Sequence, residues 1–521
     1  MVGPDYRRPA VPVADNWIEA NQGPVRTDST QPSQWWEVFH DATLARLVQI
    51  AYAQNLGLRA AGLRVVEAQA RRGITIGGLF PQTQALSGSY NRTVLSKNSF
   101  GAPSGSSSGI TGATAALGGG RSFDTWQAGF DVTWELDFWG KFRRAIESSD
   151  AQLLAAVASY DDVLVSLVAE VAATYVEIRV LDERLAVARD NVGVQQDSLR
   201  IADVRYQAGG TSERDVAQAK TLLYDTEATI PQLETQQRQS LDSLSILLGV
   251  PPSDLTDVLG SPGRVPEVPT SVAVGIPADL LRRRPDVRSA ELTAVAQSAQ
   301  IGVAKSELLP AFQLIGSVGL SAVDAGKFFE GRSFNAQTGP AVNWPILNYG
   351  RLINNVRLQD ATFQELLANY ANAVLVAQRD VEDALVGYLR GRDQVASLDQ
   401  SVAAANRAVD LSIIQYRQGA TDYTAVLNTQ QSKLRESDLL ASTRGAVALS
   451  VVSLFKALGG GWELREGQDF VDDQTRGEMR SRTPSWNGML SPESRGADVD
   501  KASADREERP WWRGRWWWPK W

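Results

Sequence analysis

Cysteine and histidine, which supply many reactive and metal-binding side chains, are nearly missing from this chain. Its 521 residues include no cysteine and a single histidine, His40. Disulfides, thiolate metal sites and a histidine metal cluster are therefore excluded, and His40 is the one residue on which a Ser-His-Asp triad could be built. A lone histidine is most often a surface or packing residue, so we expect no metal and no cofactor.

Excess positive charge and long apolar runs are also lacking. The formal net charge is −8 and the isoelectric point about 5.1, which gives no support for a nucleic-acid partner. No apolar run reaches the roughly 20 residues of a membrane-spanning helix, and the opening MVGPDY lacks the pattern of a signal peptide. The length allows several domains, although a duplicated chain can also fold as one body.

What the sequence does contain is a long internal repeat. Residues 205–249 correspond to residues 415–459 without a gap, at a constant offset of 210 (416 − 206 = 210). Matched pairs are Trp134/Trp344, Gly140/Gly350, Tyr206/Tyr416, Gly209/Gly419, Thr211/Thr421 and Gly249/Gly459. Pro81 instead corresponds to Pro310, at an offset of 229 (310 − 81 = 229). A repeat this long is a duplicated half of a molecule, so two equivalent structural roles are expected.

The chain divides into five parts along its length. We expect an irregular N-terminal segment at 1–40, a first repeat at 41–250, a proline-rich connector at 251–276, a second repeat at 277–460 and a disordered tail at 461–521. Each repeat should contain a helix, a β-hairpin, a long helix and a return helix. The first helix is predicted over 41–78, with Asp41 as its N-cap.

Two β-hairpins are predicted, at 80–139 and 309–348. Apolar and polar residues alternate along them, which is the pattern of strands with one apolar face. The apolar positions are Trp126, Ala128, Phe130, Val132, Trp134, Leu136 and Phe138 in the first copy and Phe312, Leu314, Val318, Leu320, Val342, Trp344 and Ile346 in the second. A Gly/Ser-rich loop at 101–120 joins the first pair of strands, and a loop at 324–334 joins the second. The chain should therefore hold four strands.

A very long helix is predicted after each hairpin. Residues 141–206 and 350–416 contain no proline, and about 65 helical residues extend roughly 100 Å. Each long helix should end at a glycine turn, from which a return helix runs to Gly249 or Gly459. Apolar residues lie on more than one face, as expected for helices packed between two neighbours.

The strands match the pattern of a membrane β-barrel better than that of a soluble β-sandwich. Trp126, Trp134 and Trp139 could form an aromatic girdle, and carboxylates alternate with the apolar residues. A sheet edge cannot stay open in lipid, and four strands are too few to close, since the smallest barrels need about eight. We therefore expect a barrel shared between subunits and continued by the helices as a hollow tube. Its lumen would carry Asp131, Glu135 and Asp137.

Several motifs resemble one known family. VGPDYRRP (2–9), WWEVFHDATL (35–44), LLRRRPDVRSAE (280–291) and the two glycine turns look like the outer-membrane factors of tripartite efflux pumps. The nearest branch is the TolC-like, NodT-type lipoproteins of RND efflux systems, and the resemblance covers residues 2 to about 460. It implies a homotrimer with a twelve-strand β-barrel in the outer membrane of a Gram-negative bacterium and a twelve-helix α-barrel in the periplasm.

The resemblance also implies partners and an anchor. The partners would be outer-membrane lipid, a periplasmic adaptor (membrane-fusion) protein and, through the adaptor, an inner-membrane RND pump. Members of the family carry a lipidated cysteine close to the position of Val2, so we expect the mature protein to be anchored through a residue that precedes this chain.

The family's adaptor-docking tips fall on the two glycine turns. The corresponding residues are Arg205, Gly209, Ser212, Asp215, Gly419, Thr421 and Asp422. Glycine permits the positive φ that a tight turn between helices needs, and Ser212 or Thr421 can cap the return helix. Helix capping alone would also explain these residues. Arg214 stands where the family usually has an apolar residue.

The family's periplasmic gate falls just after the second turn. A ring of Asp commonly narrows the tunnel there, but this chain has Asn428, with Thr424 one turn earlier. A carboxylate cation site is therefore not expected. The alternative is that Asn428 contacts a neighbouring helix.

The function that follows is a passive exit duct for small molecules, not an enzyme. An exit duct of a type I protein-secretion system is the alternative within transport. A structural coiled-coil protein would explain the helices but not the strands, and no paired carboxylates indicate a soluble hydrolase. The C-terminal RPWWRGRWWWPKW fits either a membrane interface or a poorly constrained tail.

Overall fold

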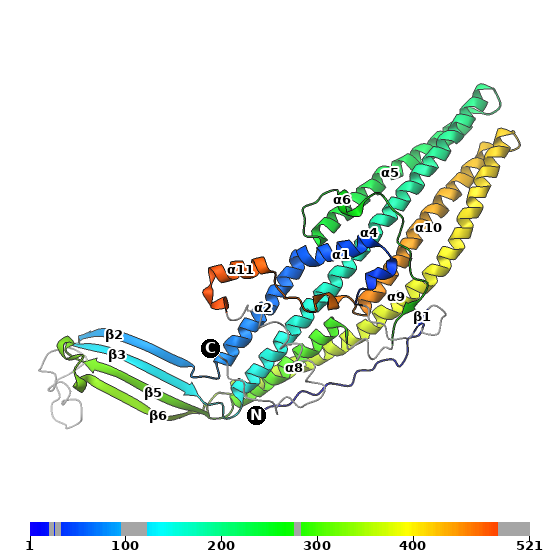
Figure 1. Cartoon of the computed structure of the whole chain (residues 1–521). Helices are drawn as coiled ribbons and strands as arrows, with labels where there is room; N and C mark the ends of the chain where they lie inside the picture. Colours follow the sequence, from blue (N-terminus) through cyan, green and yellow to red (C-terminus); the bar gives the residue numbers. More distant parts are fainter. Residues whose placement is uncertain (20–24, 27–32, 95–121, 276–282, 488–521) are drawn as a thin grey trace. The chain divides into compact units, whose positions relative to one another are not determined.

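The computed structural model describes residues 1–19, 25–26, 33–94, 122–275 and 283–487 (Figure 1). The expected Gly/Ser-rich loop at 101–120, residues 280–282 of the LLRRRP motif and the Trp-rich end of the tail lie outside these ranges. The chain forms two compact units. Unit 1 contains Met1–Arg8, Ala68–Leu153 and Thr293–Leu366, and unit 2 contains the remainder.

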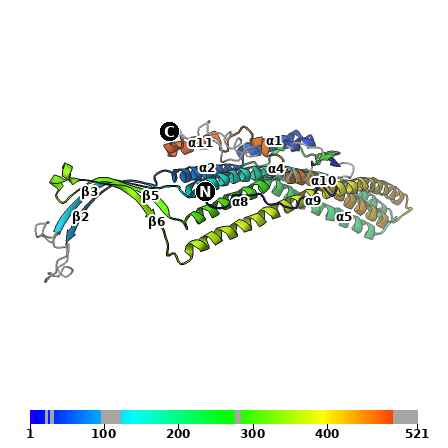
Figure 2. The same ribbon diagram turned by 90° about the horizontal axis from the view of Figure 1, so that it is seen from below.

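Unit 1 is built on one antiparallel sheet of four strands. The strands are β2 (Thr83–Val94), β3 (Ser122–Glu135), β5 (Ala311–Ala322) and β6 (Phe334–Asn343), and they lie in the order β2-β3-β5-β6. The two hairpins and four strands predicted from the alternation are confirmed. The central ladder joins β3 of the first copy to β5 of the second, and the strands bend together into a curved sheet (Figure 2).

The register places the apolar residues on one face of the sheet. Leu86, Phe130 and Val318 are paired across β2, β3 and β5. Asp131 is paired with Ala85 and Ser317, so it lies on the opposite, mainly polar face. Because side chains alternate along a strand, the expected separation of an apolar face from a polar face is confirmed.

The strands end earlier than predicted. β3 ends at Glu135, and beyond it the Leu136 N–H donates to the Phe312 carbonyl at 2.8 Å. The Phe138 ring lies 5.4 Å from the Phe312 ring, and Trp139 Nε1 donates to the Pro310 carbonyl at 2.8 Å. The Leu136 bond keeps the register of the β3–β5 ladder, one residue beyond Glu135 with Gln313, whereas Phe138 and Trp139 contact the second copy through their side chains.

The second copy shows the same early end. β6 ends at Asn343, so Trp344 and Ile346 follow the strand. Trp344 Nε1 donates to the Leu308 carbonyl at 3.1 Å, as Trp134 Nε1 does to the Leu79 carbonyl at 3.1 Å. In both copies, therefore, a tryptophan N–H near the end of the hairpin donates to a backbone carbonyl just before the first strand of the same hairpin.

The long helices and their return helices confirm the repeat. α4 (Lys141–Gln207) and α9 (Arg351–Arg417) have 67 residues each. α5 (Glu213–Leu247) and α10 (Tyr423–Ala457) have 35 residues each. All four starts and ends differ by 210 between the copies (351 − 141 and 457 − 247), so the duplication extends to helix boundaries.

The helix predicted over 41–78 is two helices. α1 (Ala42–Gln54) and α2 (Leu56–Gly77) are separated at Asn55, whose extended backbone ends one helix while its side chain accepts the Leu58 N–H at 2.8 Å. An asparagine favours such a local cap over a helical interior. The prediction that Asp41 caps α1 is confirmed, since its carboxylate accepts the N–H groups of Thr43 and Leu44.

Further elements complete the repeats and the connector. They are α8 (Pro285–Ser306), η1 (Trp35–Phe39), α6 (Thr256–Leu259) and a short parallel pair of β1 (Val25–Arg26) with β4 (Val272–Ala273). The strand pair ties the N-terminal segment to the connector within unit 2.

Among the helices that the structure describes, α10 alone is long and apolar enough to cross a membrane by length and composition. No continuous apolar run of that length is present in its sequence. More than half of the apolar window is buried inside the chain, which is the behaviour of a core helix.

The segment after Gly460 is ordered up to residue 487, which corrects the expected disorder for that part of the tail. It forms η4 (Trp462–Arg465), α11 (Asp473–Arg482) and η5 (Pro484–Asn487). Arg465 Nε lies 2.7 Å from Asp161 Oδ1 of α4, and both side chains are buried. Val471 and Met479 pack against Val66 of α2. Residues 461–487 are mainly polar, but a few apolar contacts and the buried Arg465–Asp161 ion pair hold them against α2 and α4.

Replacing Arg465 with Ala should release this segment. The change leaves Asp161 buried without its ion-pair partner, a loss of about 3–5 kcal/mol in comparable cases. We expect thermolysin to cleave the variant near Phe470 much faster than the native chain. Arg482→Ala, at an exposed position of α11, is the control. Equal cleavage rates for both variants would show that the ion pair does not hold the segment.

Candidate functional site

The two helix hairpins of unit 2 end in turns of identical construction. Gly209 and Gly419 have φ of 73° and 75°, the left-handed region that glycine adopts without strain. In the first turn the Gly210 N–H donates to the Arg205 carbonyl at 2.8 Å, and in the second the Ala420 N–H donates to the Gln415 carbonyl at 2.9 Å. This six-to-one bond is the Schellman ending of a helix. The prediction that glycine permits both turns is confirmed.

The caps of the return helices differ from the prediction. Ser212 is the N-cap residue of α5, but its side chain makes no capping bond. Asp422, not Thr421, is the N-cap of α10, and its Oδ1 accepts the Ala425 N–H at 3.3 Å. A carboxylate accepts this bond more strongly than a hydroxyl and also complements the helix dipole.

Asp215 stabilises the first turn from within. Its carboxylate accepts a hydrogen bond from the Thr211 hydroxyl, and its side chain is buried, with the residue 4% exposed. Arg214 is exposed, with Nη2 3.6 Å from Asp215 Oδ1. Asp215 therefore presents little surface to a partner in this conformation.

The two tips share one apolar core to which both copies contribute. It contains Ala202 of α4, Val216 and Ala219 of α5, Tyr416 of α9, and Tyr423 and Val426 of α10. The rings of Tyr416 and Tyr423 meet edge to face with centroids 5.4 Å apart. Burial raises the pKa of both phenols, so both stay neutral over the physiological pH range. The tips are therefore packed together.

A single arginine links the first tip to the second. The Arg205 guanidinium donates to the Tyr416 carbonyl and, through Nη2, to the Gly210 carbonyl at 3.1 Å. Its Cζ also lies 4.4 Å from the centroid of the Tyr416 ring, a cation–π distance. We call this contact the Arg205 latch. The repeat places Gln415 at the equivalent position of the second copy (415 − 205 = 210), so the latch has no counterpart there.

The expected docking residues divide by exposure. Gly209, Ser212, Gly419 and Asp422 are exposed, whereas Arg205 and Thr421 are half-buried and Asp215 is buried. The structure brings the residues of both turns to one end of the helical hairpins (Figure 1). Arg205 and Asp215 act within the chain.

The expected gate residues lie on the first turns of α10. Thr424 is half-buried, and Asn428 is exposed without a hydrogen bond to the residues that the structure describes. Their spacing of four places them on one face of the helix. A role in a gate stays a prediction.

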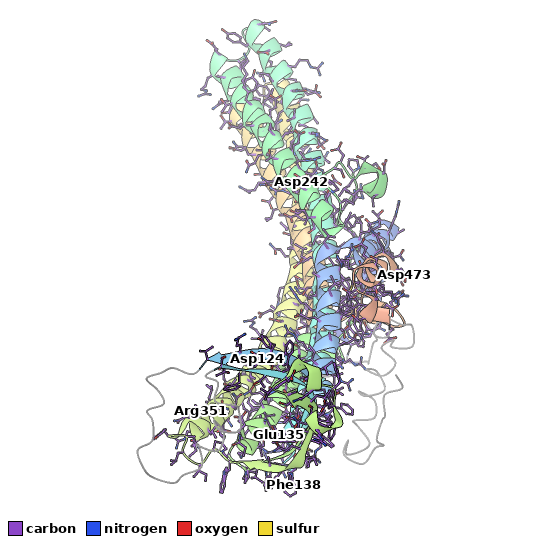
Figure 3. The ribbon with its side chains drawn as sticks, turned by 90° about the vertical axis from the view of Figure 1, so that its left-hand side faces the viewer. Asp124, Glu135, Phe138, Asp242, Arg351 and Asp473 are labelled. Carbon is purple, nitrogen blue, oxygen red and sulfur yellow. The ribbon has the colours of Figure 1, made fainter. Side chains whose placement is uncertain are left out.

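The expected lumen residues separate into two groups. Asp131 lies on the polar face of β3, where Ser87 Oγ donates to its Oδ2 at 3.5 Å. Glu135 ends the strand and lies 3.2 Å from Lys141 Nζ (Figure 3). Asp137 lies beyond the strand, and the N–H groups of Phe142 and Arg143 donate to it at 3.0 and 3.1 Å. The expectation that Asp137 continues the polar strand face is wrong, because the chain turns after Glu135 and uses Asp137 to cap α4.

A groove of about 430 Å³ lies between α4, α5 and α10 within unit 2. Both copies line it, with Leu222 and Asp225 from α5 and Leu434 from α10. Arg184 Nε of α4 and Asp438 Oδ1 of α10 meet across it at 2.7 Å. The groove therefore follows the seam between the repeats.

Along the chain, strands with one apolar face lead into paired helical hairpins, which defines a channel subunit of the bacterial outer membrane. The chain belongs to the outer membrane efflux protein family, whose model matches residues 47–250 and 276–460. This family consists of outer-membrane channels of efflux systems, so the protein is not an enzyme.

Individual relatives agree with this assignment. The chain is 33% identical to the pyoverdine export outer membrane protein OpmQ of Pseudomonas aeruginosa, over 84% of this chain and 89% of that protein. It is 30% identical to nodulation protein T of Rhizobium leguminosarum bv. viciae, over 89% of this chain and 91% of that protein. The solved structure of the outer-membrane channel OprN superposes with a TM-score of 0.80 at 30% identity, covering 89% of this chain and 99% of OprN.

The two faces of β3 should respond differently to charge. Phe130→Arg places a guanidinium on the apolar face, which costs roughly 2–4 kcal/mol near the middle of a bilayer. Thr133→Arg places it on the polar face and should be tolerated. Insertion into the outer membrane, followed by fractionation and blotting, compares the two. Equal loss of inserted protein would mean that the faces are misassigned.

The Arg205 latch should slow opening of the tips. Arg205→Gln removes the cation–π contact and a charged hydrogen bond, worth about 1.5–3 kcal/mol. We expect amides of residues 205–215 and 416–425 to exchange hydrogen for deuterium at least about 10-fold faster. Arg214→Gln, an exposed arginine on the same turn, is the matched control. Unchanged exchange in Arg205→Gln would contradict the latch.

Proposed function

We propose that this chain is one third of a passive exit duct that carries small molecules across the outer membrane and the periplasm. The observation that carries the proposal is the four-stranded sheet with two unpaired edges, in a member of the outer membrane efflux protein family. Three chains would supply twelve strands and twelve long or return helices. Twelve strands suffice for a closed barrel that leaves no edge in lipid.

The partners follow from the role of the family in efflux systems. We infer that a periplasmic adaptor contacts the exposed residues of the tips, Gly209, Ser212, Gly419 and Asp422, and lies along the groove between the repeats. An inner-membrane RND pump would deliver the cargo to the duct. Similarity to a protein of pyoverdine export favours small molecules over the protein cargo of a type I secretion system.

The gate would be a neutral ring near the tips. Three copies of Asn428, with Thr424 one turn away, would form two stacked polar rings if these helix faces meet on the axis. Because asparagine carries no charge, hydrogen bonds and packing would hold the ring closed, supported by the one Arg205 latch of each chain. Exposure of Asn428 within the single chain leaves its side chain available for such a ring.

Replacing Asn428 with Asp tests the duct and its gate together. Three carboxylates near the axis would repel one another and favour opening or binding of cations. In planar bilayers we expect the native protein to give discrete low-conductance channels, and Asn428→Asp to give a higher conductance or a new block by divalent cations.

Gln232→Glu is the matched control, because it adds the same charge at an exposed residue of α5 that lines the groove between the repeats. Its conductance should equal that of the native channel. Unchanged conductance in a well-formed Asn428→Asp oligomer would remove Asn428 from the lumen. Absence of channels from all three proteins would contradict the duct itself.

A further inference from the structure

The hairpin of β5 and β6 closes in a loop, residues 323–333, at the end of the sheet that lies away from the helices (Figure 1). β3 leads into α4 and β6 leads into α9, so the helices join the sheet at its opposite end. Proteins similar to this chain span the periplasm from the outer membrane. In the proposed duct the loop therefore lies at the outer surface of the membrane.

Hydrogen bonds within the loop give it a defined shape. Asp324 Oδ1 accepts the Gly326 N–H at 2.9 Å. The Lys327 carbonyl accepts the Glu330 N–H at 3.1 Å and the Ser333 hydroxyl at 2.7 Å. The Ser333 N–H in turn donates to the Glu330 carbonyl at 2.9 Å. Polar backbone groups of the loop are thus paired within it, and its side chains are presented outward.

The loop exposes an aromatic ring and two cations. Phe329 is 86% exposed, and its ring meets the Phe328 ring edge to face with centroids 5.0 Å apart. Lys327 and Arg332 are exposed, and neither forms an ion pair with a residue that the structure describes. Aromatic rings combined with lysine and arginine are typical of protein surfaces that enter the interfacial region of a membrane.

The sheet itself shows where the hydrocarbon of the membrane would end. On the apolar face of β3, Phe130 is followed toward the loop by Trp126, which is paired with Tyr90 of β2. Their ring centroids are 4.5 Å apart. The next pair on this face is Arg92 with Asp124, so charge follows directly after the two aromatic residues. Tryptophan and tyrosine favour the boundary between hydrocarbon and headgroups, which places this boundary at the Tyr90–Trp126 pair.

The loop begins at the same boundary. Trp126 is also paired with Ala322, the last residue of β5, so the loop starts immediately beyond the aromatic pair. Asp124 accepts the Tyr90 hydroxyl and Asp324 accepts a backbone N–H, so both carboxylates have partners within the chain. The two loop cations therefore lie at headgroup depth without a partner in the part of the chain that the structure describes.

We propose that Lys327 and Arg332 bind phosphate groups of the lipid in the outer leaflet, while Phe329 enters the boundary between its headgroups and acyl chains. Lipid A, the glycolipid of that leaflet, carries phosphates on the sugars to which its acyl chains are attached. Arginine contacts phosphate oxygens in pairs, and lysine supplies a compact charge. The proposal rests on the proposed duct, which sets the loop at the outer surface, and it names the lipid that this hairpin binds.

Binding of purified lipid A by the detergent-extracted, full-length protein tests the proposal, with affinity measured by thermophoresis at constant detergent. Each cation at an anionic lipid surface strengthens binding roughly 5-fold. We therefore expect Lys327→Gln with Arg332→Gln to weaken binding of lipid A roughly 25-fold. Lipid A from which the phosphates have been removed should bind the native chain and this double variant equally weakly.

Two further variants separate the site from net charge and from misfolding. Arg214→Gln with Lys220→Gln removes the same charge at exposed residues of α5 and should bind lipid A like the native chain. Glu330 is an exposed carboxylate of the loop. Glu330→Gln should tighten binding of lipid A, because it removes repulsion of the phosphates, and a gain of affinity cannot arise from a misfolded loop.

The outcomes distinguish the lipid site from the duct. Equal affinity of the native chain and the Lys327→Gln/Arg332→Gln variant for lipid A would overturn the site. A changed conductance or ion selectivity of that variant in phosphatidylcholine bilayers would also overturn it, because the cations would then face the lumen. Either result, with native channels intact, leaves the duct standing. Absence of channels from the native protein would instead contradict the duct.

Discussion

In the part of the chain that the structure describes, the four-stranded sheet has unpaired backbone N–H and C=O groups along its two edge strands. These groups limit the environments in which the chain can be stable. In the hydrocarbon of a membrane each unsatisfied N–H or C=O costs several kcal/mol, so an open edge is not a stable end point. β2 and β6 are such edges, and the apolar face between them needs lipid. In the proposed duct, the chain meets both demands by offering its edges to further copies. Oligomerisation would then be part of folding.

Because the chain is internally duplicated, contacts between the two copies of the repeat occur within a single chain. The central β3–β5 ladder of unit 1 joins a first copy to a second copy, and the tip core of unit 2 joins the same two copies. The Arg205 latch departs from this symmetry because Gln415 replaces the arginine in the second copy. The Arg205 latch is therefore a contact between the two tips of one chain that the second copy does not duplicate.

The sequence predicted the elements well wherever local pattern decides the structure. The long helices begin and end within one residue of the predicted bounds, and the glycine turns need positive φ at Gly209 and Gly419. Errors arose where tertiary contacts override the pattern. Leu136 and Phe138 continue an alternating pattern, but β3 ends at Glu135: Leu136 keeps one backbone bond to Phe312, and Phe138 contacts the Phe312 ring.

The site shows the same division between local and long-range information. Exposed tip residues follow from the turns, whereas the Arg205 latch joins positions 211 residues apart and leaves no local signal. Periodicity places Asp137 on the polar face of the strand, because its capping of α4 depends on a turn that the alternating pattern does not record. The Arg465–Asp161 ion pair joins residues 461–487 to α4, and such a contact cannot be predicted from the polar composition of that segment.

We propose that the folded unit in the membrane is a closed ring of three chains. Native mass spectrometry of the detergent-extracted protein measures this directly, because the mass of one chain is 56.6 kDa. We expect one dominant species that contains three chains and stays intact when its ions are mildly activated in the mass spectrometer. A folded monomer that is stable in detergent would contradict it, since such a monomer would have to leave both sheet edges open.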